Sequence, residues 1–412
     1  MARTAATIGG RASRSGQPDG PHPYAGRRML FLVDRARFFA SHRLHLGRRA
    51  LTEGYSVHLA AGDDAVVQSI AASGIGMHVI PIARGFAAPW RELRTLLAVD
   101  AVIRRVRPDL LHLVTIKAVL VGGILARRHR VGAVVYAISG LGYLFTSNTL
   151  SVRLVRQLIL PIYRFALKHP RSAIIVQNRD DEAELLRLRI ASFDRIVLIE
   201  GAGVDTEHFA AAPASMERTV LFIGRLLAHK GVRELVAAMR LVRREIPDAR
   251  LILAGELDTA NPSSVRPEEL DGWILEGFVE SPGHVDDIRD VMRRAAVVCL
   301  PSYREGLPKA LLEAAACQRA IVATDVPGCR SAVVSGETGI LVPARDPEAL
   351  ARALVALLVD PALCEAYGRA GRCYVAQRFS ERAVQDATFR VYERLLSSVP
   401  GGAAALTNAP PN

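Results

Sequence analysis

Acidic residues are missing from a long internal stretch of this sequence. Between residues 110 and 179 there is no Asp or Glu, whereas ten Lys and Arg occur there. The imbalance belongs to the first half of the chain, because residues 1–205 hold 29 Lys and Arg against 15 Asp and Glu, and the remainder holds 24 against 26. A basic half of this kind attracts an anionic partner, such as lipid headgroups, an anionic small molecule or nucleic acid.

Long apolar runs, a signal sequence and cysteine motifs are also lacking. No uninterrupted apolar stretch reaches the ~20 residues that span a bilayer, and residues 1–25 lack the apolar segment of a secretory signal. The five cysteines show no Cys-x-x-Cys spacing, which excludes an obvious disulfide framework or zinc site and favours a reducing compartment. We therefore expect a cytoplasmic protein that lies, at most, on a membrane surface.

Short apolar segments alternate with amphipathic ones, and the alternation restarts near residue 203. In the first series, Arg28–Val33 predicts a buried strand and a helix is expected from about Ser41 to Glu53. In the second series, Thr219–Ile223 and Ile274–Gly277 are among the predicted strands. Short apolar strands joined by helical crossovers are typical of parallel sheets covered on both faces. The sequence predicts an α/β fold of two facing Rossmann-like domains with a cleft between them.

The sequence around Glu305 predicts a site that recognises both charge and hydroxyl groups. An apolar strand ending near Leu300 is followed by a loop and by Gly306-Leu307-Pro308, where Pro308 suits the first position of a helix. A helix start offers unpaired amides and the positive end of the helix dipole, which suit a phosphate or a polar sugar. Glu305 and Glu313 bracket this start and can accept hydrogen bonds from hydroxyl groups.

Two cations are expected at the same edge of the second sheet. The strand Thr219–Ile223 leads into Gly224-Arg225, and Lys230 precedes the next helix. Both cations thus follow the carboxyl end of one strand, where doubly wound sheets bind their ligands. Arg can grip a diphosphate through its planar fork, and Lys acts as a point charge. The alternative is that both are ordinary solvated loop cations.

Three segments resemble the C-terminal domain of the family 4 retaining glycosyltransferases. They are FIGRLLAHKGVRELVAA (222–238), PSYREGLPKALLEAAACQRAIVAT (301–324) and GETGILVPARDPEALARAL (336–354). In the first half, residues 34–43 and Ser139-Gly140-Leu141-Gly142 are more similar to a bacterial subgroup that extends polyprenyl-diphosphate-linked sugars. The resemblance implies the GT-B architecture and transfer of a sugar from a nucleoside diphosphate to a lipid-linked saccharide, in the synthesis of surface polysaccharides or glycans.

The resemblance also assigns roles to individual residues. Donor binding falls to Gly224, Arg225, Lys230, Glu305, Gly306, Leu307 and Glu313, of which Arg225, Lys230 and Glu305 would also act in catalysis. Acceptor binding is assigned to His42, Arg43, Lys117, Gly140 and Gly142, and His42 and His112 are candidate catalytic residues because a histidine can position a hydroxyl group or share its proton. His42, Arg43, His112 and Lys117 lie at expected carboxyl ends of strands or at helix starts. For each histidine a structural role is the alternative. The family needs neither a metal nor another cofactor, and the chain has no Asp-x-Asp metal signature.

Together, pattern and resemblance divide the chain into six parts. These are a disordered arm (1–25), an N-terminal acceptor-binding domain (26–203), a linker (204–217), a C-terminal nucleotide-sugar-binding domain (218–379), a helix crossing back to the N-terminal domain (380–398) and a disordered tail (399–412). Residues 153–168, RLVRQLILPIYRFALK, mix cations with large apolar residues. This segment fits either a membrane surface or a core helix whose Arg side chains reach solvent.

The sequence says less about the substrates than about the fold. We expect a UDP-sugar donor, with a GDP-sugar as the alternative, a hexose or N-acetylhexosamine as the sugar, and a lipid-linked acceptor at the inner face of the cytoplasmic membrane. Two other functions are alternatives to this interpretation. A nucleotide-sugar epimerase would share the fold but needs no basic first half, and a nucleic-acid-binding protein is not expected because the chain has no RNA-binding signature.

Overall fold

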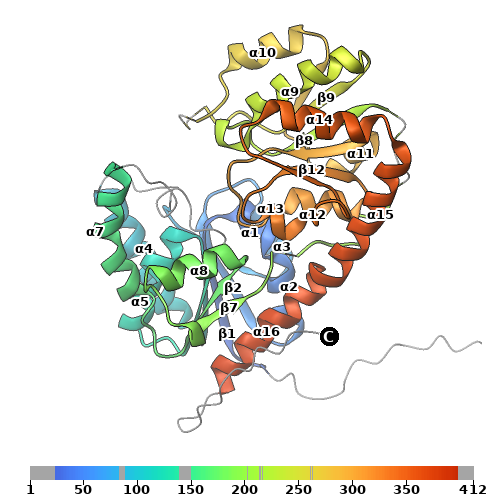
Figure 1. Ribbon diagram of the computed structural model, residues 1–412. Coiled ribbons are helices and arrows are strands. Elements are labelled where there is room, and N and C mark those ends of the chain that lie inside the picture. The colour runs from blue at the N-terminus through green and yellow to red at the C-terminus, as the bar shows by residue number, and fades with distance from the viewer. Residues whose placement is uncertain are drawn as a thin grey trace, which may run out of the picture.

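The two alternating series form two separate parallel sheets, each covered by helices (Figure 1). The computed structural model describes residues 24–82, 89–138, 150–201, 203–212, 215, 217–259, 261 and 263–397, with backbone only for 150–156 and 158. Nearly all of the expected arm (1–25) and all of the expected tail (399–412) lie outside these ranges.

The first sheet has the strand order β3-β2-β1-β4-β5-β6-β7. Its strands are β1 (Arg28–Arg35), β2 (Ser56–Gly62), β3 (Gly76–Val79), β4 (Leu110–Val114), β5 (Ala133–Ile138), β6 (Ser172–Val176) and β7 (Ile196–Leu198). Its helices are α1 (Ala36–His42), α2 (Leu44–Thr52), α3 (Val67–Ala72), α4 (Pro89–Val106), α5 (Ile116–Arg128), α7 (Leu150–Ala166) and α8 (Arg179–Arg187). Strands β4, β5 and β6 are buried along their whole length, as expected for a parallel sheet with helices on both faces.

The second sheet has the strand order β10-β9-β8-β11-β12-β13. Its strands are β8 (Thr219–Ile223), β9 (Arg250–Ala254), β10 (Val279–Gly283), β11 (Val297–Leu300), β12 (Ala320–Thr324) and β13 (Ile340–Val342). The associated helices are η2 (Ala228–Lys230), α9 (Val232–Glu245), α10 (Pro267–Leu275), α11 (Ile288–Arg294), α12 (Lys309–Ala316), α13 (Cys329–Ala332), α14 (Pro347–Leu358) and α15 (Pro361–Arg378). The strand order reverses between β8 and β11, and the carboxyl ends of these two strands are where a ligand of such a sheet is expected.

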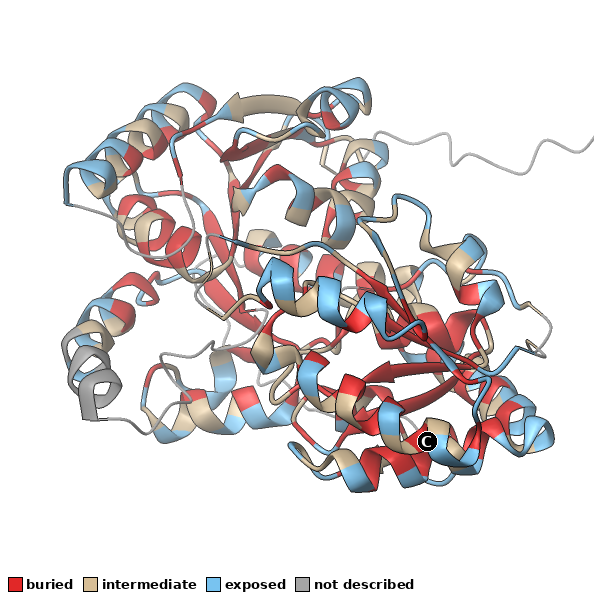
Figure 2. Cartoon of the chain, turned by 90° about the horizontal axis from the view of Figure 1, so that it is seen from above, coloured by how far each residue is buried: buried red, intermediate tan, exposed pale blue. Residues whose placement is uncertain are grey.

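Buried residues gather in the strands and on the inner sides of the helices, whereas the outer helix faces are exposed (Figure 2). The first sheet separates two hydrophobic clusters, one on each face, and the second domain has a single large cluster. The two domains therefore have hydrophobic cores of their own.

The last helix, α16 (Glu381–Ser397), returns to the first domain, where it contacts α2, β5 and β6 (Figure 1). Its residues Val384, Phe389 and Tyr392 belong to one hydrophobic cluster of the first sheet. The chain therefore crosses between the domains twice, and the crossings are joined. The amide of Val204 donates to the carbonyl of Phe379 at 2.9 Å, and the amide of Glu381 donates to the carbonyl of Val204 at 3.1 Å.

Several expected elements are wrong in place or extent. The strand expected at Ile274–Gly277 is the end of helix α10, and the strand begins only at Val279. The apolar residues here do not form a buried strand, because Leu275 is 86% exposed and Gly277, at φ +80°, ends the helical segment. The single helix expected over Ser41–Glu53 is two helices, which Arg43 separates at φ −137°.

Two helix starts also differ from the sequence prediction. Helix α12 begins at Lys309, so Pro308 is its N-cap residue and not its first helical residue. Helix α15 was not predicted, although Asp360 caps it by accepting from the amide of Leu363 at 3.0 Å and Pro361 occupies its first position. An Asp-Pro start of this kind was a usable signal in the sequence.

The contact between Tyr392 and His112 predicts a measurable effect on stability. The Tyr392 hydroxyl and His112 Nδ1 lie 2.6 Å apart, and both side chains are buried. Tyr392→Phe should lower the free energy of unfolding by about 1–2 kcal/mol, because a buried polar nitrogen loses its partner. Urea unfolding measures the change. Tyr367→Phe on α15, where the tyrosine is partly buried, serves as control, and equal stability of both variants would contradict the prediction.

Candidate active site

The carboxyl ends of β8 and β9 lie so close that glycine is required there. A Cβ atom on Gly255 would lie 1.9 Å from the carbonyl oxygen of Gly224. The Gly224 amide in turn donates to the carbonyl of Ala254 at 3.0 Å, and Gly224 has φ +147°. This packing turns the chain after β8, so that Arg225 stands at the edge of the sheet.

Arg225 is held by a carboxylate of its own domain. Its Nη1 lies 2.6 Å from Oδ2 of Asp258, in the segment that follows β9, and both side chains are about one-third exposed. The pair keeps the guanidinium extended at the sheet edge, where its remaining N–H groups can meet an anion.

Lys230 is placed by a second close packing of glycine against backbone. Gly231 adopts φ +71°, and a Cβ atom there would lie 2.1 Å from the carbonyl oxygen of Pro301, which follows β11. The loops after β8 and β11 are thereby locked together, and the Tyr303 amide donates to the carbonyl of His229 at 2.9 Å. As a result Lys230 Nζ lies 2.5 Å from Oε1 of Glu305, with both side chains mostly buried.

Three of the predicted donor-site residues share one electrostatic environment. Burial lowers the pKa of His229, the positive charges of Lys230 and Arg225 lower it further, and the negative charge of Glu305 opposes them. His229 therefore lies within electrostatic reach of all three. The structure brings Arg225, Lys230 and Glu305 together at the switch point between β8 and β11, where the sequence placed them.

The backbone beside Glu305 offers the expected donors. The amides of Gly306 and Leu307 donate no hydrogen bond to another residue in the described part of the chain. On its other side the loop touches Gly328, where a Cβ atom would lie 2.3 Å from the Gly306 carbonyl oxygen. A polar ligand at the loop can therefore accept from two neighbouring amides.

Glu313 belongs to a second group at the domain interface. Its Oε1 lies 3.4 Å from Nζ of Lys309, and Lys309 Nζ also donates to the carbonyl of Ser41 in the N-terminal domain at 2.6 Å. Burial raises the pKa of the Glu313 carboxyl above its ordinary value, and Lys309 offsets part of this effect. No contact among the described side chains joins Glu313 directly to Lys230 or Arg225, so the four residues form two neighbouring groups and not one.

His42 lies beside that second group, at the end of α1. Its Nδ1 lies 2.6 Å from the hydroxyl of Ser41, and its ring stacks on Phe38 at 4.2 Å between centroids. Burial, together with the positive charges of Lys309 and Arg43, lowers the pKa of His42 to about 3. His42 is therefore neutral at neutral pH and can form hydrogen bonds as a neutral imidazole, whereas its lowered pKa disfavours holding a proton.

His112 and Arg43 do not occupy the positions expected for acceptor-site residues. His112 is the middle residue of β4, and not its carboxyl end, and it is only 1% exposed. Arg43 is likewise buried, and both lie close to Tyr392 of the crossover helix. This placement gives no support to a catalytic role for His112, and we interpret both residues as part of the packing beneath α16.

Lys117 follows the expected start of α5 but forms an ion pair with Glu92 of α4 at 2.9 Å, and its side chain is almost fully buried. Gly140 and Gly142 lie outside the described residues. The acceptor side therefore rests on His42 alone among the predicted residues.

Sequence reasoning missed several residues that hold the site. They are Asp258, Lys309, Arg304, Asn178 and Asp181. Asp258 is 33 residues from Arg225, and Lys309 is 268 residues from Ser41, so no local pattern in the sequence indicates these contacts. Asn178 and Asp181 carried a signal, because an Asn followed three residues later by Asp after a buried strand marks a helix start.

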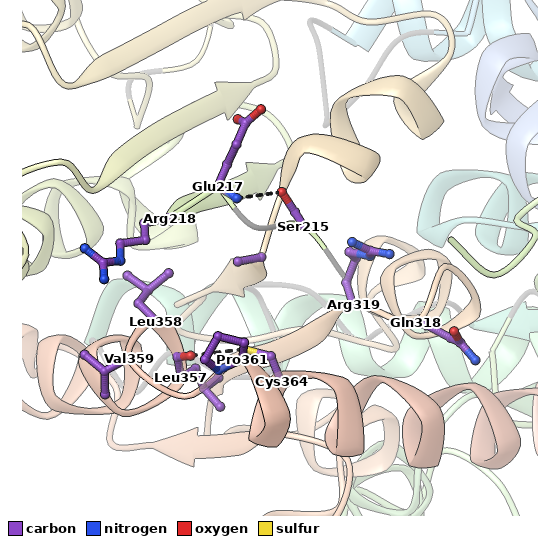
Figure 3. Close-up of a pocket in the computed structure, with 11 residues that line it drawn as sticks. Ser215, Glu217, Arg218, Gln318, Arg319, Leu357, Leu358, Val359, Pro361 and Cys364 are labelled. Atoms are coloured by element: carbon purple, nitrogen blue, oxygen red, sulfur yellow. Dashed lines mark hydrogen bonds between the residues drawn. The ribbon is translucent and has the colours of Figure 1, made fainter. Parts of the chain in front are cut away.

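The two cavities that the structure describes lie away from these residues. The first, of about 140 Å³, is lined by residues that precede β8, β11 and β12, at the amino ends of the strands (Figure 3). Its Arg319 donates to the carbonyls of Cys317 at 3.1 Å and Ala295 at 3.2 Å, and to that of Ala212. The second is lined by residues such as Asp109 and Gly132, which precede β4 and β5. Neither cavity contains a predicted site residue.

None of the helices in the described ranges has both the length and the apolar character needed to cross a membrane.

Comparison with known proteins gives matches in both domains. The family model described as "Glycosyl transferases group 1" matches residues 217–360, and the one described as "Glycosyl transferase 4-like" matches residues 28–178. A curated relative, the N,N'-diacetylbacillosaminyl-diphospho-undecaprenol alpha-1,3-N-acetylgalactosaminyltransferase of Campylobacter jejuni, is 24% identical over 350 residues, which cover 82% of this chain and 90% of the relative.

Solved structures share the fold at low sequence identity. Sucrose-phosphate synthase from Thermosynechococcus elongatus gives a TM-score of 0.74 with 22% identity, covering 90% of this chain and 99% of the other. Anabaena HepE in complex with UDP and glucose gives a TM-score of 0.75 with 17% identity, covering 89% and 100%. The architecture is thus GT-B, as expected, and with both domains matched by models of one family, this chain belongs to the group 1 and 4-like glycosyltransferases.

Proposed function

We propose that this glycosyltransferase moves a hexose or N-acetylhexosamine, with retention of anomeric configuration, from a nucleoside diphosphate to a lipid-linked saccharide. The observation that carries the proposal is the group formed by Arg225, Lys230 and Glu305 beside the amides of Gly306 and Leu307. Cations and amides suit the diphosphate, and the carboxylate suits sugar hydroxyls.

Charge stabilisation is the main catalytic effect available to these residues. When the glycosidic bond breaks, negative charge develops on the departing diphosphate, and Arg225 and Lys230 are already held at the sheet edge by Asp258 and Glu305. Preorganised cations of this kind stabilise the transition state without rearrangement. We propose that they take the place of a metal ion. Glu313 would bind the ribose hydroxyls from its position on α12.

Donor and acceptor are inferred from relatives together with the site. A structural neighbour binds UDP and glucose, and a relative is named for a sugar carried on a diphospho-undecaprenol. We therefore favour a UDP-sugar over a GDP-sugar and a polyprenyl-diphosphate-linked saccharide as acceptor. His42, which is neutral at neutral pH and lies at the interface, is the residue that we propose to contact the acceptor hydroxyl.

A surface for the lipid part of the acceptor lies on α4 and α7. Trp90, Leu93 and Leu97 are 64%, 55% and 58% exposed and share one face of α4 by their spacing. On α7, Ile162 and Phe165 are both 49% exposed. Both helices pack against α5 (Figure 1).

The basic residues near this apolar surface indicate which partner it binds. Helix α7 lies within the stretch from residue 110 to 179 that has no acidic residue, and Arg127 of α5 stacks over the ring of Phe165 at 4.4 Å. Apolar groups beside cations fit a membrane with anionic headgroups. We propose that the enzyme lies on the inner face of the cytoplasmic membrane through α4 and α7.

Lys230→Ala should abolish the thermal stabilisation that UDP gives the protein, because the variant lacks the point charge that meets the diphosphate. Differential scanning fluorimetry measures the shift. Arg240→Ala is a matched control, since Arg240 also lies 2.5 Å from a glutamate, Glu276, but on the outer surface of the domain. A full UDP shift in Lys230→Ala would remove Lys230 from the site.

Donor binding should weaken in mildly acidic solution. The folded-state pKa of Glu313 lies above 4.5, so the carboxylate that accepts from ribose hydroxyls is lost as the pH falls through that raised value, earlier than for an ordinary glutamate. Calorimetric titration with UDP over a pH series measures the effect. In Glu313→Gln the affinity should be lower and should lose this pH-dependent step; an identical profile in both proteins contradicts the assignment.

Binding to anionic vesicles should depend on the face of α4. The double variant Trp90→Ser, Leu93→Ser should lose most of its co-sedimentation with phosphatidylglycerol vesicles while its UDP shift is unchanged, because apolar burial at the lipid surface is removed. Leu275→Ser, at an 86% exposed leucine in the other domain, is the control. Equal loss in the control, or none in the double variant, speaks against this surface.

The reaction itself is tested with isotope-labelled UDP-sugars and a polyprenyl-diphosphate-linked saccharide. Transfer of the label to the lipid fraction is expected. Release or isomerisation of the sugar without any acceptor would instead favour an epimerase of the same fold.

A further inference from the structure

Glu305 lies in a loop that is held by the opposite domain as well as by its own. The two residues on either side of it both contact the start of α8 in the N-terminal domain. Nη2 of Arg304 lies 3.1 Å from Oδ1 of Asp181, and the carbonyl oxygen of Gly306 accepts from Nδ2 of Asn178 at 2.7 Å.

The start of α8 is itself rigid. The Asn178 side chain caps the helix by accepting from the amide of Asp181 at 2.8 Å, and its Nδ2 also donates to Oδ2 of Asp181 at 3.0 Å. Asn178 is fully buried, and the Asp181 side chain is 2% exposed. A carboxylate in the first turn is favoured by the helix dipole, but a buried one needs partners with good geometry. Asn178 and Arg304 meet this need from opposite domains.

The remaining contacts nearby are of a different kind. Asp180, the neighbour of Asp181, is about half exposed and lies 3.6 Å from Nη2 of Arg330. Exposed pairs at such a distance contribute little. In the described part of the chain, the buried side chains of Asn178 and Asp181 thus both contact the loop that carries Glu305.

We infer that Asn178, Asp181 and Arg304 form a latch that positions the donor loop, so that Glu305 meets the donor sugar only while the two domains hold this arrangement. Because Lys230 and Arg225 belong to the C-terminal domain alone, the cations that attract the diphosphate remain in place when the latch is open. The latch therefore acts on the sugar and on the transfer step. The inference rests on the proposed function of Glu305.

The test separates the two hydrogen-bonding roles of Asn178. Asn178→Ser keeps an oxygen that can cap α8, but its shorter side chain lacks the Nδ2 that donates to the carbonyl of Gly306 and to Asp181. Arg304→Met removes the partner of Asp181 while keeping an unbranched side chain. Each variant should lower kcat for sugar transfer by about 10- to 100-fold, the usual cost of misplacing a reacting group. The Kd for UDP should rise by a much smaller factor, because Arg225 and Lys230 remain in place. The double variant should lose less than the product of the two single losses, because both act on one loop.

Two control variants distinguish loss of the latch from a general disturbance of the site. Asp180→Asn removes a carboxylate from the same turn of α8 and should leave kcat unchanged, and Arg304→Lys should recover part of the activity lost in Arg304→Met. Unchanged kcat in Asn178→Ser and Arg304→Met would overturn the latch. So would loss of UDP affinity in step with kcat, which would indicate collapse of the whole site.

A second measurement does not depend on activity. Hydrogen–deuterium exchange of peptides covering residues 302–311 should be faster in Asn178→Ser and Arg304→Met than in Asp180→Asn. If the wild-type protein neither binds UDP nor transfers sugar, the proposed function fails, whereas the exchange data still decide whether the latch exists. Equal exchange in all three variants shows that it does not.

Discussion

The site depends on the ion pair between Lys230 and Glu305, which joins the loops that follow the two strands flanking the switch point of the second sheet. The pair forms because Gly231 lies directly against the carbonyl of Pro301, leaving no room for a side chain. The packing of the two loop backbones therefore determines where the side chains of Lys230 and Glu305 lie. An anionic ligand arriving there meets a lysine whose orientation is already fixed, and no ordering of a long flexible side chain has to accompany binding.

Charge neutrality in the resting protein follows from the same arrangement. Each of the two cations at the sheet edge has a carboxylate partner, Asp258 for Arg225 and Glu305 for Lys230. Two unpaired cations so close together would repel each other. A bound sugar donor would affect Asp258 and Glu305 differently. Asp258 serves only the arginine, whereas Glu305 stands beside the amides of Gly306 and Leu307 and can turn from the lysine to a hydroxyl group. Lys230 can therefore exchange one anionic partner for another while it stays in place.

The sequence predicted the fold class, and it placed Arg225 and Lys230 at the same sheet edge because both follow strand β8 closely in the chain. It failed where position depends on tertiary packing. His112 looked like a strand-end residue, but the strand continues past it and the crossover helix covers it. The contact of Lys309, the partner of Glu313, with the carbonyl of Ser41 in the other domain was likewise not predicted. Contacts between domains, such as Arg304 with Asp181, join residues more than a hundred positions apart, and no local pattern in the chain encodes them.

The paired hydrogen bonds at Val204 have a mechanical consequence. Both connections between the domains pass through one point, where Val204 is bonded to Phe379 on one side and to Glu381 on the other. Two chain connections at separate places would resist rotation of one domain relative to the other. Joined at one point, they would let one domain turn against the other by bending the chain at a single junction. Gly203 lies at this junction with φ +83°, and a Cβ atom there would lie 2.9 Å from the backbone of Glu381, so a side chain at this position would force the two crossings apart.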